Sequence, residues 1–114
     1  MQSNGEAMEF QRLIDEALIV RKEYEAKEKQ LYGSPWTREE IALGFVGDVG
    51  DLAKLVLAEN GKRNITNSKE KLGHELADCL WSLIVLSKLH DIDLETSFMK
   101  TMEELKSHLL ETQE

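Results

Sequence analysis

Proline, cysteine and aromatic side chains are scarce in this chain of 114 residues, which has one proline, one cysteine and 6% aromatic residues. This scarcity favours helices over strands, because proline breaks helices and aromatic residues are enriched in strands. The single cysteine, Cys79, excludes a disulfide within the chain, is typical of a reducing compartment and has apolar neighbours that predict burial. No apolar run approaches the about 18 residues of a membrane-spanning helix, and no segment resembles a signal peptide. We therefore expect a cytoplasmic protein without a membrane partner.

Basic side chains are outnumbered by acidic ones, 14 to 22, which gives a formal net charge of −8. Such a balance makes nucleic acid an unfavourable partner, and an acidic protein that handles phosphates needs cations to mediate the contact. Hydrophobic residues make up 41% of the chain and charged residues 32%. At this length the composition predicts one small globular domain over residues 6–114, preceded by a flexible tail at residues 1–5.

Helical periodicity of apolar residues and helix-end signals divide the chain into four segments. Thr37 and Glu40 have the spacing of a capping box, the pair Asn60-Gly61 supplies a stop, and Asp93 can cap the last helix. The connections are short and no alternation typical of strands is present. The prediction is an all-α fold, a four-helix antiparallel bundle. The expected helices span about residues 6–31, 37–59, 67–90 and 93 to near the end of the chain.

The third predicted helix also indicates an assembly. Between residues 76 and 89, apolar side chains point in almost every direction around the helix axis. A helix that is apolar all round is buried all round, and a four-helix monomer of this size has too little surface to cover it. We therefore expect a homo-oligomer, either a homo-dimer or a homo-tetramer.

Two pairs of acids lie among apolar residues on the two middle helices. Asp48 and Asp51 are three positions apart, as are Glu75 and Asp78, so each pair shares one helix face. The middle of the connecting loop lies about twelve residues from Asp51 and from Glu75, and about fifteen from Asp48 and Asp78, which sets equal heights in an antiparallel pair. The spacing predicts that four carboxylates converge on one place.

Converging carboxylates in an apolar setting either take up protons or hold a cation, because desolvation and mutual repulsion disfavour the charged forms. Oxygen ligands alone suit Mg²⁺ or Mn²⁺ better than Zn²⁺. We therefore expect Asp48, Asp51, Glu75 and Asp78 to form a metal site, with a solvated acidic face as the alternative. Three glycines beside the first pair leave room for a ligand or for a closely packed helix: Gly44, Gly47 and Gly50.

The segments VGDVGDLAKL and HELADCLWSLIVLSKLHDIDL resemble the motifs of the MazG-type all-α nucleotide pyrophosphohydrolases, including their single-domain, dCTP pyrophosphatase-like members. The similarity covers about residues 41–94. It implies that the four acids bind Mg²⁺, and that the protein hydrolyses a nucleoside triphosphate to the monophosphate and pyrophosphate as a dimer or tetramer. Such enzymes include those that remove non-standard deoxynucleoside triphosphates.

Roles for individual residues follow from this chemistry. Glu75 or Asp51 can act as the general base that activates a water. The resemblance further implies that basic residues of the last helix hold phosphates, for which the chain offers Lys100 and Lys106. Trp36 is positioned to stack on a nucleobase, with packing in the core or an interface as its alternative. Three more cations lie just beyond the first acidic pair and can either reach phosphates or serve solubility: Lys54, Lys62 and Arg63.

Two alternative functions remain open at this point. The first motif has Asp48 and Asp51 where the resembled family usually has glutamates, and the last helix is poor in basic residues. These departures favour a catalytically silent helical module that acts through metal or nucleotide binding or through oligomerisation. The second alternative is a relative of phosphoribosyl-ATP pyrophosphatase, an enzyme that shares the fold.

Overall fold

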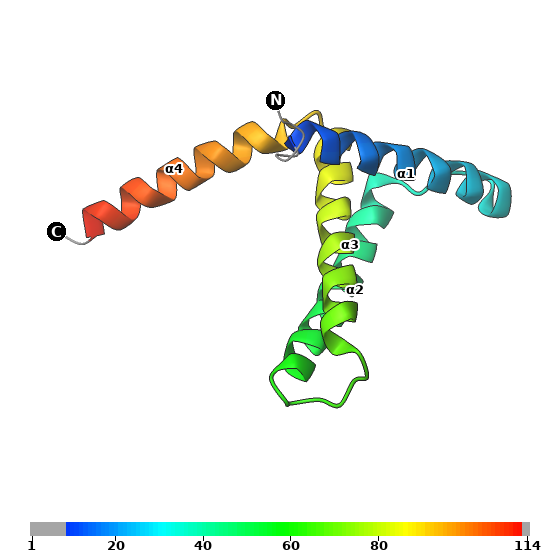
Figure 1. Ribbon diagram of the computed structural model, residues 1–114. Coiled ribbons are helices and arrows are strands. Elements are labelled where there is room, and N and C mark those ends of the chain that lie inside the picture. The colour runs from blue at the N-terminus through cyan, green and yellow to red at the C-terminus, as the bar shows by residue number, and fades with distance from the viewer. Residues whose placement is uncertain (1–8, 113–114) are drawn as a thin grey trace, which may run out of the picture.

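The computed structural model describes residues 9–112, which contain four α-helices and no strand (Figure 1). This confirms the all-helical prediction for the described part of the chain. The tail predicted at residues 1–5 lies outside the described residues. The helices are α1 (Phe10–Tyr32), α2 (Arg38–Glu59), α3 (Ser68–Leu89) and α4 (Leu94–Thr112).

Local sequence signals explain where the first two helices begin and end. Gly33 ends α1 in the left-handed conformation, with φ of 89°, and its N–H donates to the carbonyl of Lys29. This geometry suits glycine because it has no Cβ. The predicted capping box at the start of α2 is confirmed, since Thr37 accepts from the N–H of Glu40 and the Glu40 carboxylate accepts from the N–H of Thr37.

The last two helices begin in different ways. Asp93 caps α4 as predicted: its Oδ1 accepts from the N–H of Thr96 at 3.1 Å and its Oδ2 from the Thr96 hydroxyl at 2.9 Å. These hydrogen bonds lower the pKa of Asp93 below its ordinary value. The third helix begins directly after Asn67, at the predicted place, but the Asn67 side chain makes no capping hydrogen bond and its φ is 56°. The loop is therefore turned by the backbone of Asn67, whose residue type tolerates this conformation.

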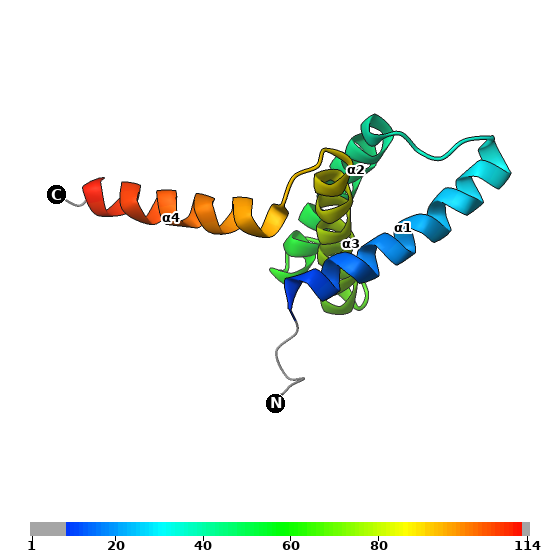
Figure 2. The same ribbon diagram turned by 90° about the horizontal axis from the view of Figure 1, so that it is seen from above.

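Helices α2 and α3 run side by side in opposite directions, and α1 crosses α3 at their upper end (Figures 1 and 2). The core is small and lies where α1 meets α3. Its centre consists of Ile14, Ala17 and Ile84, and the indole N–H of Trp81 donates to the carbonyl of Ala17 at 3.0 Å. Partly buried side chains complete this core: Phe10, Leu18, Trp81 and Leu94.

Helix α4 leaves this group and extends away from it in both views (Figures 1 and 2). Leu94, at its start, packs against the core. The radius of gyration is 17.7 Å, whereas a compact domain of this length has about 13 Å. The antiparallel pair of the predicted bundle is therefore present, but α4 does not close a bundle within one chain.

Large apolar side chains remain exposed on each of the four described helices. On α3 they are Leu76, Leu80 and Leu83, whose spacing places them on one stripe, and on α4 they include Phe98 and Leu105. The third helix, which the sequence predicts to be apolar and buried on all sides, is thus covered on one side only. Among the helices described, none is long and apolar enough to cross a membrane.

Candidate functional site

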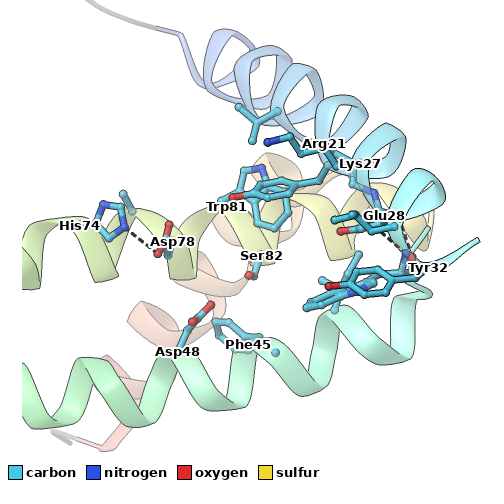
Figure 3. Close-up of a pocket in the computed structure, with 17 residues that line it drawn as sticks. Arg21, Lys27, Glu28, Tyr32, Phe45, Asp48, His74, Asp78, Trp81 and Ser82 are labelled. Atoms are coloured by element: carbon cyan, nitrogen blue, oxygen red, sulfur yellow. Dashed lines mark hydrogen bonds and ion pairs between the residues drawn. The ribbon is translucent and has the colours of Figure 1, made fainter. Parts of the chain in front are cut away.

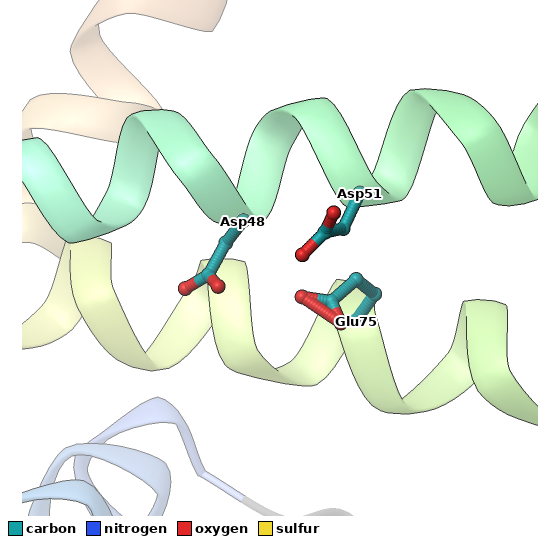
Figure 4. A group of neighbouring side chains, drawn as sticks. All are labelled: Asp48, Asp51 and Glu75. Carbon is teal, nitrogen blue, oxygen red and sulfur yellow. The ribbon is translucent and has the colours of Figure 1, made fainter.

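Three of the predicted acids come together between α2 and α3. Asp48 and Asp51 project from α2 and Glu75 from α3, toward the same space (Figure 4). Each offers one carboxylate oxygen, and these oxygens lie within 4.8 Å of one another. Asp48 and Glu75 are half-buried, whereas Asp51 is exposed. The spacing argument therefore identified a real cluster, in which oxygen ligands from two antiparallel helices can surround a cation.

The fourth acid, Asp78, lies close by but has another partner. Its Oδ2 is 3.3 Å from Nε2 of His74, one turn earlier on α3. The His74 side chain is exposed, whereas that of Asp78 is half-buried. Asp78 therefore borders the cluster of Asp48, Asp51 and Glu75, and its charge acts on the cluster although its oxygens are not part of it.

The electrostatics of the cluster oppose full ionisation. Burial, followed by the charges of Asp78 and Asp51, raises the pKa of Asp48, and a side-chain hydrogen bond with Glu75 partly opposes this rise. Burial also raises the pKa of Glu75, together with the charges of the three neighbouring aspartates, whereas the charge of His74 lowers it. Within residues 9–112, no lysine or arginine forms an ion pair with these acids. A bound cation would relieve this repulsion.

Cys79 lies beside the cluster and is buried, as predicted. Burial raises the pKa of its thiol, and the charges of Asp48, Glu75 and Asp78 raise it further. A protonated, buried thiol is a poor nucleophile and a poor metal ligand. The chemistry of this site therefore belongs to the carboxylates.

A pocket of about 750 Å³ opens next to the acids, between α1, α2 and α3 (Figure 3). Asp48, His74 and Asp78 lie at one end of it, and Glu28 and Tyr32 lie at the other. Much of its wall is aromatic, and the rings of Tyr24 and Trp81 meet edge to face with centroids 5.6 Å apart. The aromatic side chains that line it are Tyr24, Tyr32, Trp36, Phe45 and Trp81. The pocket can take a flat, largely apolar group beside a cation.

Trp36, predicted to stack on a base, lines this pocket and is 43% exposed. Its neighbour across the pocket wall is Gly44, where an added Cβ would lie 3.5 Å from the indole ring. Gly44 therefore lies beside the indole ring of Trp36. Gly47 and Gly50 have nothing within 4 Å of an added Cβ, so none of the helices within residues 9–112 packs closely against them.

Two residues that the sequence analysis did not select, Arg21 and Glu28, also line the pocket. Both are buried, and both bond to the backbone of Trp36. They lie on the face of α1 that holds Ile14 and Ala17 in the core. Two charges on an otherwise apolar helix face were the signal that could have identified them.

The predicted phosphate-binding cations are not brought to the acids. Lys54 is exposed on α2, and Lys62 and Arg63 lie in the connection between α2 and α3. Lys100 and Lys106 are exposed on α4, the helix that extends away (Figure 1). A single chain therefore places acids and aromatic rings around the pocket, but few cations.

Comparisons of the chain with protein-family models, with curated proteins and with solved structures found no match. The resemblance to the pyrophosphohydrolases therefore depends on the two acidic motifs and on what the geometry around them supports.

Proposed function

We propose that the protein is a Mg²⁺-dependent hydrolase, with Mn²⁺ as a substitute, that converts a nucleoside or deoxynucleoside triphosphate to the monophosphate and pyrophosphate in the cytoplasm. The observation that carries this proposal is the group of three carboxylate oxygens within 4.8 Å of one another, beside a pocket with aromatic walls. The acids suit the metal–triphosphate end of a nucleotide, and the pocket suits its base. The two acidic motifs that resemble the MazG-type family lie on α2 and α3, the helices that form the cluster.

The residues take distinct roles in this proposal. Asp48, Asp51 and Glu75 hold the cation, with Asp78 at the border of the site. A divalent cation supplies there the positive charge that an anionic triphosphate needs next to an acidic protein. Glu75 is the better of the two candidates for the general base, because it is half-buried between α2 and α3 whereas Asp51 is exposed. Asp51 is exposed and serves as a ligand.

The working form in this proposal is a homo-dimer or homo-tetramer in which a second copy covers the open faces. The exposed apolar side chains on α3 and α4 and the extended shape support it. Surfaces of this kind are rarely left uncovered in soluble proteins. A second copy would also complete the predicted four-helix bundle and would give Lys100 and Lys106 an acidic or phosphate partner.

A silent module that binds metal or nucleotide without turnover is the second candidate. It is favoured by the position of Lys100 and Lys106, which α4 carries away from the acids of its own chain. Phosphoribosyl-ATP is an alternative substrate for the same site, since it offers the same triphosphate anhydride.

The decisive experiment measures pyrophosphate release from a panel of nucleoside and deoxynucleoside triphosphates and phosphoribosyl-ATP, with and without Mg²⁺. We expect metal-dependent release with at least one substrate. Asp51→Asn and Glu75→Gln should each lower it by about 100-fold or more, since residues outside the ligand set already change metal affinity or activity by about 10–100-fold.

The matched control is Glu70→Gln, which alters an exposed carboxylate in the first turn of α3. It should retain the wild-type rate. Nucleotide binding without any release would overturn the hydrolase in favour of the silent module. Release that persists in both acid variants would show that the cluster is not the reactive site.

A further inference from the structure

Arg21 and Glu28 form a buried pair of opposite charges on α1, two turns apart. Their exposed fractions are 7% and 9%, and Nη1 of Arg21 lies 3.9 Å from Oε1 of Glu28. Burying an ion pair costs much of the free energy that the attraction returns, so such a pair is weak grounds for stability by itself. The burial of this ion pair on the core-facing side of α1 therefore needs an explanation other than stability.

Arg21 also forms an ion pair with Glu25, at 3.6 Å, but the hydrogen bonds of Arg21 and Glu28 converge on one residue. The N–H of Trp36 donates to Oε1 of Glu28 at 2.8 Å, and Nη2 of Arg21 donates to the carbonyl of Trp36 at 2.9 Å. Both backbone polar groups of Trp36 are thus held by side chains of α1, across the turn that Gly33 begins. We call Arg21 and Glu28 the Trp36 clamp. Because the backbone of Trp36 is held from two sides, the position of its indole on the pocket wall is set by α1.

Arg21 has more hydrogen-bonding capacity than the fold uses. Its side chain is 9% exposed, and its Nε and Nη1 are buried without a hydrogen-bond acceptor among the residues that the structure describes. A buried donor without an acceptor costs free energy. These two atoms have no access to solvent, so leaving them without an acceptor is a cost that accompanies the placement of Arg21 at the backbone of Trp36.

The surroundings of the clamp define the ligand chemistry. Arg21, Glu28 and Trp36 line the same pocket as Tyr24 and Trp81, with Asp48 at its other end (Figure 3). Aromatic walls suit a flat ring, and the indole of Trp36, which is 43% exposed, offers such a ring a stacking face. A nucleobase is a flat ring of this kind.

We propose that the Trp36 clamp determines how tightly the protein holds a nucleobase in this pocket, with Trp36 as the stacking wall and with Arg21 and Glu28 as the side chains that fix its position. The identification of the ring as part of a nucleotide rests on the proposed function. Arg21 and Glu28 are positioning residues, because they act through Trp36 and lie away from the acids that would hold the cation.

The test compares the wild type with the double variant Arg21→Met/Glu28→Gln. Methionine fills the space of the arginine without its charge, and glutamine can still accept from the N–H of Trp36, so no unpaired charge stays buried. KM for the triphosphate should rise by about tenfold or more, in line with the loss of a charge-assisted hydrogen bond, while kcat changes by less than about threefold. A change in kcat with KM unaltered would overturn the proposal, as would wild-type values for both.

The matched control is Arg12→Met, an exposed arginine on the same helix, which should keep the wild-type KM. The helical circular dichroism of the double variant should equal that of the wild type. Should it fall, Arg21→Lys replaces the double variant, because lysine keeps the charge beside Glu28 but loses the planar fork of donors. Its KM should also rise, and an unchanged KM in Arg21→Lys would equally overturn the proposal.

A second measurement separates this inference from the hydrolase. Calorimetric titration with cytidine, uridine, adenosine and guanosine, without Mg²⁺, probes the pocket alone, since nucleosides carry no phosphate. At least one nucleoside should bind the wild type and bind the clamp variant about tenfold more weakly. If the wild type releases no pyrophosphate but this difference is found, the hydrolase fails and the clamp stands. Nucleosides that bind both proteins equally, or bind neither, would overturn the clamp whatever the activity.

Discussion

Asp48 and Glu75 carry the clearest chemical signal at the scale of single residues. Burial and neighbouring negative charges raise the pKa of both. The usual paired carboxyl in a protein has a lowered pKa and stabilises the fold at neutral pH. For Asp48 and Glu75 the pKa shift has the opposite sign, because the folded state favours the protonated form of both side chains. The cost of keeping these acids ionised is present at neutral pH and disappears as the pH falls through their raised folded-state values.

We therefore predict that the metal-free protein gains stability from this cluster as the pH is lowered from 7 toward the ordinary carboxyl range of about 4. Asp48→Asn should be more stable than the wild type at pH 7, and the difference should shrink with falling pH. Urea denaturation at several pH values measures this. The groups facing Asp48 are Asp51, Glu75, Asp78 and, through Asp78, His74.

Addition of Mg²⁺ in the same denaturation experiment distinguishes a metal site from a solvated acidic face. Ligand binding to the folded state raises its stability. The ion should stabilise the wild type at pH 7, should do so progressively less as the pH is lowered and protons compete for the ligands, and should have no effect on Asp48→Asn. Equal pH profiles for wild type and variant, with no response to Mg²⁺ in either, would contradict the prediction.

At the scale of helices, the start of α2 matters most, because it places Trp36 on one side of the pocket and aims the first acidic pair on the other. The capping box of Thr37 and Glu40 satisfies two backbone N–H groups that would otherwise have no partner. Trp36, whose backbone is held by the Trp36 clamp, lies one residue before Thr37. Side chains from both α1 and α2 therefore hold this short connection in place by hydrogen bonds to its backbone.

Thr37→Ala should lower the free energy of unfolding by about 1 kcal/mol, the typical loss for an N-cap threonine. Chemical denaturation at a fixed protein concentration measures it. Thr101→Ala is the matched control, since Thr101 is exposed within α4 and alanine is the better helix former there. The control should be neutral or slightly stabilising. An equal loss in both variants would show that the capping box contributes nothing.

The whole molecule is open rather than closed. Helix α4 extends away from the α2–α3 pair (Figure 2). The apolar stripes on α3 and α4 are exposed to solvent. The single chain therefore exposes surface that a second copy would cover. Its small core, centred on Ile14, Ala17 and Ile84, also leaves little burial to stabilise one copy alone.

Light scattering should give a mass of two or four times the chain mass of 13.0 kDa. Phe98→Glu should shift the protein toward the single chain, because it places a charge on the apolar stripe of α4. Ser107→Glu adds the same charge about half a turn away around the helix and should leave the mass unchanged. A wild-type mass of one chain would refute the assembly.

Much of the candidate site could be predicted because it depends on short-range rules. The capping box, the stop at Asn60-Gly61 and the Asp93 cap depend on neighbours within four residues. Helical spacing and the length of one hairpin then bring Asp48, Asp51 and Glu75 together, because a hairpin fixes the register of its two helices. These features followed from the sequence alone.

Other features were decided by the tertiary structure, because they depend on how separate helices approach one another. The sequence does not reveal that α1 crosses α3, so the contacts of Arg21 and Glu28 with Trp36 could not be foreseen. Nor does it reveal that Asp78 pairs with His74 and acts on the cluster of Asp48, Asp51 and Glu75 only through its charge. The direction of α4 follows from a turn at Asp91, with φ of 55°, and not from any periodicity. Local rules determine helices and the register of a hairpin, whereas crossing angles depend on contacts that form only when the chain has folded.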